Sequence, residues 1–418
     1  MSARLRAVGP DLRRVNQSAL LRLLFLEGPL DRVRLGQMTG LSSGTVTNFV
    51  ASLLEDGLII EVGREQSEGG RPRVLLGVNP EYGAVVGVDI GETGIRVEAF
   101  DLDLRVIGVS DVALHPQHVD AAVTVSETAR AIERLQDRLQ IEGRRLLGVG
   151  VGVPGMVEHG SSGARVHAPL IGWQDVPLER QLHDLIDEPI FVENGAKAIG
   201  QAEMWLGAGR GARDAIVTLW GTGVGAAIFT DGALYRGTTS SAGEWGHTCI
   251  VAGGHKCRCG STGCLEAYIG AESLLDEWRR NDPLATPNLD ADDETWAARL
   301  IEAALDGGPA AETLEVAANY FGIAAANLAN LFNPEVIVIS GWLGLALGPA
   351  ILERIRDIVN EQALDYTASC VRIELGRFRD DAIVLGASSL VVDEMLANGG
   401  VVPRGVVRGR PGLLARPR

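Results

Sequence analysis

Apolar residues recur at helical spacing in the first sixty positions, and glycines separate the helices that this spacing predicts. The first predicted helix spans residues 16–27 and carries its apolar face on Leu20, Leu23, Leu24 and Leu26. A second helix is predicted over residues 30–39. Ser42 can cap a third helix, whose apolar stripe consists of Val46, Phe49, Val50, Leu53 and Leu54.

The outer face of this third helix is polar and uncharged. It carries Ser43, Thr45, Thr47 and Asn48, and short polar side chains suit contact with base edges in a major groove. Residues 58–62 and 73–78 then predict two strands around a glycine-rich basic loop, with Arg64, Arg71 and Arg73 available for phosphates or a minor groove. Three helices and a hairpin predict a DNA-binding winged helix-turn-helix. The alternative is a small helical domain that binds protein.

After Asn79-Pro80 the pattern changes to apolar runs that predict buried strands. These cover residues 84–90, 146–153, 215–219 and 335–340, with helices over residues 119–140, 310–331 and 351–362 and a loop over residues 341–348. Two strands lead into glycine turns, Asp89-Ile-Gly-Glu-Thr93 and Gly221-Thr-Gly-Val-Gly225. Such turns bring backbone amides to a phosphate. This internal repeat predicts two α/β lobes that close around a nucleotide.

Length and charge divide the chain. With 418 residues, the chain is too long for one compact core, so two or three domains are expected. The net charge is -16, but residues 1–80 carry ten Arg against eight acidic residues and residues 401–418 carry five Arg and no acid, so the middle is strongly acidic. DNA contact is therefore expected in the N-terminal part. The sequence contains no apolar run of about 18 residues and no signal-peptide pattern. We therefore expect a cytoplasmic protein without a membrane segment.

Between residues 244 and 266, His247, Cys257, Cys259 and Cys264 crowd together. One imidazole and three thiolates are the ligand set of a closed, structural zinc site, and Gly260 and Gly263 allow the sharp turns that this requires. The alternative is a cysteine-rich turn with no metal or with a disulfide. We expect the remaining cysteines, Cys249 and Cys370, to be small core residues.

The chain resembles the ROK family of bacterial repressors and sugar kinases, in its transcriptional-regulator branch. The resemblance rests on Ala-Gly-Glu-Trp-Gly-His at 242–247, Cys-Arg-Cys-Gly-Ser-Thr-Gly-Cys-Leu-Glu at 257–266, the 221–225 turn, Asn-Leu-Phe-Asn-Pro-Glu at 330–335 and Gly-Gly-Arg-Pro at 69–72. It implies a two-lobed actin-like sugar-kinase (ribonuclease H-like) α/β fold behind the winged helix, a bound zinc, and a sugar site formed by Gly155, Asn194, Glu244, His247 and Glu266.

Three positions depart from the family's kinases. Gly195 replaces the Asp that serves as general base, and glycine cannot accept a proton. Glu92 replaces a glycine of the first phosphate turn and would repel a triphosphate. The adenosine-side glycine run is reduced to Ser340-Gly341-Trp342. We therefore predict that the protein is not an enzyme; an active kinase would need a replacement base, for which Glu193 and Glu203 are the candidates.

The resemblance and the departures together predict a sugar-responsive transcriptional regulator, a repressor that binds operator DNA and a monosaccharide and forms a homodimer or tetramer. The alternatives are an active sugar kinase that also binds DNA and a constitutive DNA-binding protein with a vestigial pocket. We expect a winged helix in residues 1–80, a first lobe in 81–190 completed by a helix over 384–398, a second lobe with the zinc site in 191–383, and a disordered basic tail in 399–418.

Overall fold

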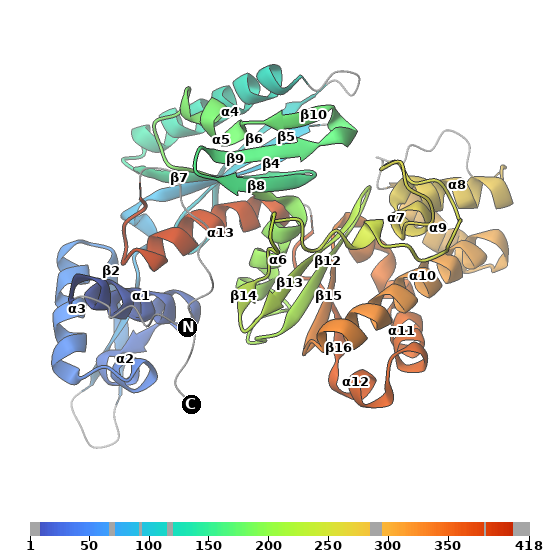
Figure 1. Cartoon of the computed structure of the whole chain (residues 1–418). Coiled ribbons are helices and arrows are strands. Elements are labelled where there is room, and N and C mark those ends of the chain that lie inside the picture. The colour runs from blue at the N-terminus through green and yellow to red at the C-terminus, as the bar shows by residue number, and fades with distance from the viewer. Residues whose placement is uncertain are drawn as a thin grey trace, which may run out of the picture. The chain divides into compact units, whose positions relative to one another are not determined.

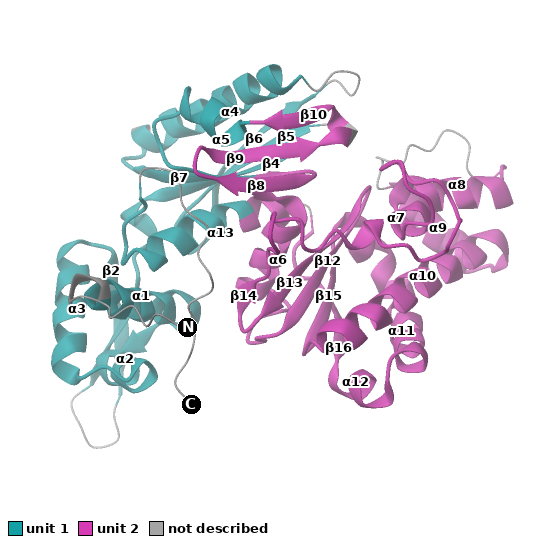
Figure 2. Cartoon of the chain, viewed as in Figure 1, with its two compact units in different colours: residues 1–151, 177–192, 387–407 teal, residues 152–176, 193–386, 408–418 magenta. Residues whose placement is uncertain are grey.

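A computed structural model describes residues 9–66, 72–91, 94–114, 120–284, 295–379 and 382–403. The chain forms two compact units (Figure 2). Unit 1 contains residues 1–151, 177–192 and 387–407, and unit 2 contains residues 152–176, 193–386 and 408–418. Figure 1 labels the helices and strands of both.

The N-terminal part of unit 1 contains three helices and a small sheet. Its elements are α1 (Gly9–Glu27), β1 (Leu30–Asp31), α2 (Arg32–Thr39), α3 (Ser43–Glu55), β2 (Ile59–Glu65) and β3 (Arg73–Val78), with the sheet order β1-β3-β2. This is the predicted order, with one difference. Leu30 and Asp31 form a strand instead of helix, because the Asp31 carboxylate accepts the Val33 and Arg34 amides and so caps α2.

The larger sheet of unit 1 has the order β11-β7-β4-β5-β6. Its strands are β4 (Ala84–Ile90), β5 (Gly94–Phe100), β6 (Val106–Ala113), β7 (Leu146–Val153) and β11 (Ile190–Asn194), the last of which ends in unit 2. Strands β4, β5 and β6 form an antiparallel meander. Helices η1 (Pro80–Tyr82), α4 (Ala121–Ile141) and α5 (Leu178–His183) belong to this unit, and α4 packs on β6 and β5.

Unit 2 contains a second five-stranded sheet, ordered β14-β13-β12-β15-β16. Strands β12 (Ala215–Trp220) and β13 (Val224–Thr230) form a hairpin, and β14 (Ala233–Leu234) extends it. On the other side of β12, β15 (Val336–Ser340) and β16 (Arg372–Leu375) run parallel. A separate sheet in this unit consists of β8 (Met156–Gly160), β9 (Gly163–Ala168) and β10 (Trp173–Val176), and η2 (Pro169–Ile171) precedes β10.

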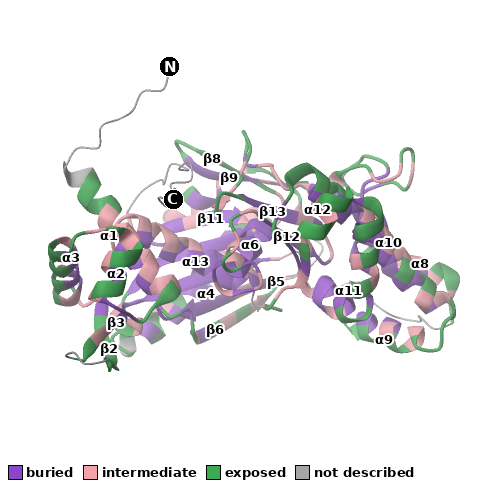
Figure 3. Cartoon of the chain, turned by 90° about the horizontal axis from the view of Figure 1, so that it is seen from below, coloured by how far each residue is buried: buried purple, intermediate pink, exposed green. Residues whose placement is uncertain are grey.

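Helices pack on the sheet of unit 2, and most of them share an apolar core with it; Figure 3 shows the buried residues in purple. They are α6 (Gly195–Leu206), η3 (Trp245–His247), α7 (Glu266–Ile269), α8 (Ala271–Asn281), α9 (Thr295–Ala304), α10 (Gly308–Phe332), α11 (Trp342–Gln362) and α12 (Asp365–Cys370). The loop predicted for residues 341–348 is wrong, because α11 begins at Trp342. Burial of Leu343 and Leu347 in the core outweighs the glycines and Pro349 that favoured a loop.

Helix α13 (Ala382–Ala397) is divided between the units, since residues 382–386 belong to unit 2 and the rest to unit 1. In unit 1 its C-terminal end is tied to α1. The Arg22 guanidinium lies 2.5 Å from the Asp393 carboxylate, and the Gln17 amide donates to the Gly399 carbonyl at 2.8 Å. Among the described residues, no helix is long and apolar enough to cross a membrane.

Candidate metal and sugar site

The predicted metal ligands converge in unit 2. His247 ends the short helix η3, and the three cysteines lie on the loop that follows. Two isolated antiparallel β-bridges of the backbone fold this loop back on itself, one between Cys249 and Cys264 and one between Lys256 and Thr262. Gly260 and Gly263 have φ values of 93° and 79°, and a Cβ on Gly263 would collide with the Val251 carbonyl. The glycines are therefore required for the turn, as predicted.

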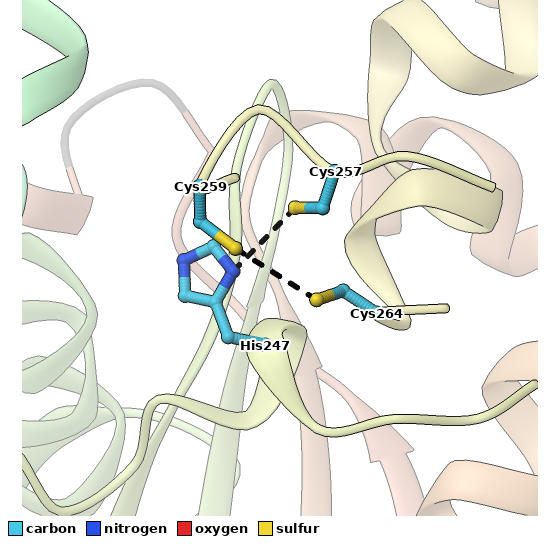
Figure 4. Close-up of side chains that lie close together, drawn as sticks. All are labelled: His247, Cys257, Cys259 and Cys264. Carbon is cyan, nitrogen blue, oxygen red and sulfur yellow. Dashed lines mark hydrogen bonds between the residues drawn. The ribbon is translucent and has the colours of Figure 1, made fainter. Parts of the chain in front are cut away.

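The four ligand atoms lie within 4.8 Å of one another (Figure 4). The His247 Nδ1 atom is 3.7 Å from the Cys257 sulfur, and the Cys259 and Cys264 sulfurs are 3.8 Å apart. Four ligands at zinc–ligand distances of about 2.0–2.3 Å in a tetrahedron are separated by roughly 3.6–3.8 Å. The donor set and its spacing thus fit a zinc ion. All five cysteines are free in this structure, which gives the disulfide alternative no support.

Burial and hydrogen bonding set the acidity of these thiols. Burial raises the pKa of Cys257 to about 12 and also raises the pKa of Cys264, whereas the Ser261 backbone amide lowers the pKa of Cys259. Three adjacent thiolates need a cation between them to stay ionised. Cys249 and Cys370 are exposed, so their assignment to the core is wrong; both stand in loop or helix-end positions at the surface.

Asn194 and Gly155, two of the predicted sugar ligands, are in direct contact. The Asn194 side-chain amide donates to the Gly155 carbonyl at 2.6 Å, and its oxygen caps α6 by accepting the Ala196 and Lys197 amides at 3.0 and 3.2 Å. Gly155 has a φ of 76°, and a Cβ there would collide with the His167 carbonyl. The geometry gives Asn194 a structural role whatever else it binds.

Glu266 and Glu244 lie on the metal-binding segment. The Glu266 carboxylate accepts the Val224 amide at 2.9 Å and the Arg258 guanidinium at 3.0 Å, and one of its oxygens is 4.0 Å from the Cys257 sulfur. Burial raises the pKa of Glu244; His247 and Lys197 oppose this shift, and Glu266 reinforces it. Unit 2 therefore places Glu244 and Glu266 within electrostatic range of each other and beside the predicted metal ligands.

Three charged residues of this region were not predicted, Lys197, Arg236 and Arg258, and Glu193 was named only as a candidate replacement base. Arg236 pairs with Glu193, and Lys197 donates to the Ser240 carbonyl. Their only signal in the sequence is the position of Glu193 and Lys197 on either side of Asn194. Arg236 lies 43 residues from Glu193, so only the fold reveals that pair, whereas Arg258 pairs with Glu266 eight residues further along the chain.

The residues expected beside the nucleotide of a kinase, and the candidate base Glu203, are closely packed by their neighbours. Gly195 is buried at the first turn of α6, with Ile383 3.3 Å from the place of a Cβ. Trp342 lies against the Gly221 turn, where a Cβ would stand 2.9 Å from its indole nitrogen. The Glu203 carboxylate accepts the Ala208 and Arg377 amides at 2.8 and 2.7 Å and is fully buried. Glu92 lies outside the described residues.

The predicted DNA-binding residues lie on α3 and the hairpin. Ser43, Thr47 and Asn48 are exposed and Thr45 is half-buried, while the apolar stripe of α3 faces the core. Arg64 is exposed on β2. Arg73 is 3.5 Å from the buried Asp31 carboxylate, so it also stabilises the start of α2. Arg71 lies outside the described residues.

Two α/β sheets of similar design, a winged-helix region and a His/Cys₃ cluster define the class: an actin-like α/β protein with an N-terminal helical DNA-binding-type region. The "ROK family" model matches residues 85–394. The chain is 31% identical over 395 residues to a xylose repressor of Caldicellulosiruptor bescii, covering 92% of this chain and 97% of that protein. The chain belongs to the ROK family.

Two further relatives represent the family's two branches. A glucokinase of Halalkalibacterium halodurans is 34% identical over 318 residues, covering 73% of this chain and 94% of that enzyme. The crystal structure of a ROK family transcriptional regulator, a homolog of the E. coli MLC protein, superimposes with a TM-score of 0.79 at 23% identity, covering 93% of this chain and 98% of that one. The predicted fold class is confirmed.

Proposed function

We propose that this protein is a sugar-responsive transcriptional repressor that binds operator DNA in the cytoplasm. The observation that carries the proposal is the full-length similarity to the xylose repressor, which extends over the winged helix as well as the ROK domain. The exposed polar face of α3 supports base contact. Glu244, Glu266 and Asn194 support sugar binding in unit 2.

Selection of DNA from a random duplex library tests this function. The protein should enrich a near-palindromic sequence, because a homodimer presents two recognition helices about 34 Å apart. D-xylose, D-glucose or N-acetylglucosamine should then change the affinity for that sequence. A Glu244→Ala variant should bind the same DNA without a sugar response. Enrichment that no sugar alters would favour a constitutive DNA-binding protein.

We infer that the metal in the His/Cys₃ cluster is zinc with a structural role. Zinc would be held by His247 Nδ1 and the three sulfurs, and Figure 4 shows the other ring nitrogen directed away from the sulfurs. One residue can thus contact both metal and sugar, so the metal orients a sugar ligand. Metal analysis of the purified protein should give one zinc per chain, and Cys259→Ser should lower this value.

We also propose that the protein lacks kinase activity. Gly195 has no proton-accepting group, and neither candidate base is available. Glu203 is saturated by backbone amides, and Glu193 pairs with Arg236. Incubation with Mg-ATP and the sugar panel should release no ADP. The Gly195→Asp variant supplies the missing carboxylate, because Gly195 does not have a positive φ and the nearest atoms to its Cβ position are Ile383 at 3.3 Å and the Val153 carbonyl at 3.7 Å. ADP release by the wild-type chain would overturn the proposal.

Sugar and DNA binding need a physical link, and we propose helix α13 for it. In unit 2 its residue Ile383 approaches Gly195 at the start of α6, and Gly386 packs closely on the Ala198 carbonyl. In unit 1 its other end holds α1 of the winged helix through Asp393 and Gly399. One continuous helix therefore contacts the sugar-site helix at one end and the DNA-binding region at the other.

A further inference from the structure

Two charged contacts join the start of helix α6 to the loop that carries Glu244. Arg236 stands at the beginning of this loop, and its guanidinium donates to the carboxylate of Glu193, the residue before Asn194. Lys197, three residues after Asn194, donates to the backbone carbonyl of Ser240. The two contacts thus lie on either side of Asn194. Residues 236–244 are called the clamped loop below.

Three of the four groups in these contacts are almost fully buried, and the Arg236 side chain is 33% exposed. Exposed fractions are 1% for Glu193, 2% for Lys197 and 8% for Ser240. Burial opposes the ionisation of Glu193, but the charges of Arg236, His159 and Lys197 outweigh it and lower its pKa to about 2. Charges that are buried and paired are costly to separate, because each leaves an uncompensated partner behind. The contacts therefore restrain the clamped loop more strongly than surface ion pairs would.

The clamped loop has little freedom of its own. The Ala242 amide donates to the Arg236 carbonyl at 3.1 Å, and the Ala226 amide on β13 donates to the Gly243 carbonyl at 2.9 Å. Ser240 has a φ of 61°, which a non-glycine residue adopts only when its surroundings hold it. Lys197 supplies such a restraint. Glu244 follows directly, so its backbone position depends on the clamped loop.

We propose that Lys197 and Arg236 are positioning residues of the sugar site, which set Glu244 relative to Asn194 without touching the sugar. This inference rests on the proposed sugar binding. The charge of Lys197 matters as well as its hydrogen bond, because Glu193 and Glu244 both act on it electrostatically. A neutral donor at position 197 could still donate to the Ser240 carbonyl. It would, however, remove the positive charge that lies near both Glu193 and Glu244.

Calorimetry with D-xylose, D-glucose and N-acetylglucosamine tests the inference on the full chain. Lys197→Met should weaken binding of the responsive sugar by tenfold or more, while zinc remains at one per chain. Lys197→Arg keeps the cation and should bind within about threefold of wild type, a rescue that packing alone does not provide. Arg213→Met is the matched control, since it removes an exposed pair with Asp231 in the same unit and should change nothing.

The outcomes separate this inference from the proposed function. Wild-type sugar affinity in Lys197→Met would overturn the positioning role and leave sugar binding intact. If Lys197→Met does not fold, Lys197→Gln replaces it, and wild-type affinity in that variant would overturn the requirement for charge. No heat of binding with any sugar in the wild-type chain would instead overturn the proposed function and this inference with it.

Discussion

Helix α3 and the His/Cys₃ cluster are both candidate binding sites, but they are built in opposite ways. On α3 the polar residues are held by local contacts: Thr45 bonds to Ser42, and the Thr47 hydroxyl donates to the Ser43 carbonyl at 2.8 Å. In the cluster, residues from separate turns converge and two of the three sulfurs are buried. One site is a face of a single helix, and the other exists only after a loop has folded.

The difference reflects the size of the ligand. DNA is larger than the protein surface that reads it, so a recognition helix needs exposed side chains and a firm anchor beneath them. A metal ion must instead be surrounded by its ligands, which folding has to bring together from separate turns. We therefore expect substitutions on α3 to act one residue at a time, and substitutions in the cluster to act on the whole site.

Cys264→Ser should produce the largest effect. Cys264 is one of the two buried cysteines of the cluster, so loss of its sulfur removes a predicted metal ligand from inside the folded loop. Zinc content should fall below one per chain, the sugar response should disappear, and thermal unfolding should begin at a lower temperature. The same preparation should still bind DNA at the wild-type salt dependence. Full zinc occupancy in this variant would contradict the ligand assignment.

A pH series should separate the two units through one carboxylate in each, the half-buried Asp89 in unit 1 and the buried Glu193 in unit 2. Burial raises the pKa of Asp89 to about 7, although Arg96 opposes the shift. The folded state then binds a proton more tightly than the unfolded state, so the stability of unit 1 is fully present below about pH 4 and declines as pH rises to about 7. Asp89→Asn should remove this loss, which amounts to at most about 4 kcal/mol at 1.4 kcal/mol per pKa unit.

Glu193 in unit 2 should behave in the opposite sense. Its pKa of about 2 lies below the ordinary value, so its contribution is present above pH 4.5 and is lost as pH falls toward 2. Urea unfolding at pH 3, 5 and 8, followed for each unit by hydrogen exchange, checks both signs. Identical pH profiles for wild type and Asp89→Asn would argue against a protonated Asp89.

Asn48→Ala should weaken DNA binding without altering the sugar site. Asn48 is exposed on α3, and loss of one good base contact costs about 1–3 kcal/mol, or roughly 5- to 150-fold in affinity. Fluorescence anisotropy with the selected duplex measures the change. Arg64→Ala is the comparison: as a phosphate contact it should weaken all sequences alike and reduce the salt dependence. Equal losses on specific and random DNA for Asn48→Ala would remove it from the base-reading set.

Ser42→Ala should have the smallest effect. The Ser42 hydroxyl accepts the Thr45 amide at 3.2 Å and so caps α3. Its removal should lower stability by about 1 kcal/mol and reduce DNA affinity only slightly, because the stripe of Val46, Phe49, Val50 and Leu53 still anchors the helix. Chemical denaturation measures the loss of stability, and anisotropy measures the loss of DNA affinity. A large loss of affinity would show that the cap, and not only the buried stripe, is needed to hold the recognition helix in place.

Local patterns were sufficient for many of the elements. The predicted strands over residues 73–78, 84–90 and 146–153 have the observed bounds, because short, mostly apolar runs between turn residues favour buried strands. The predictions failed where local and tertiary preferences disagree. The N-terminal half of α11 contains two glycines and Pro349, yet it is helical because its leucines are buried.

The sequence alone predicted the candidate metal ligand set, since three thiols and an imidazole within a short glycine-containing segment are typical of a zinc site. It also determined the family and the loss of a side chain at Gly195. Only the tertiary structure decided which charges meet. Glu193 and Arg236 are 43 residues apart, as are Lys197 and Ser240. Contacts between residues so far apart leave no periodic pattern in the sequence, so the partners become known only when the chain has folded.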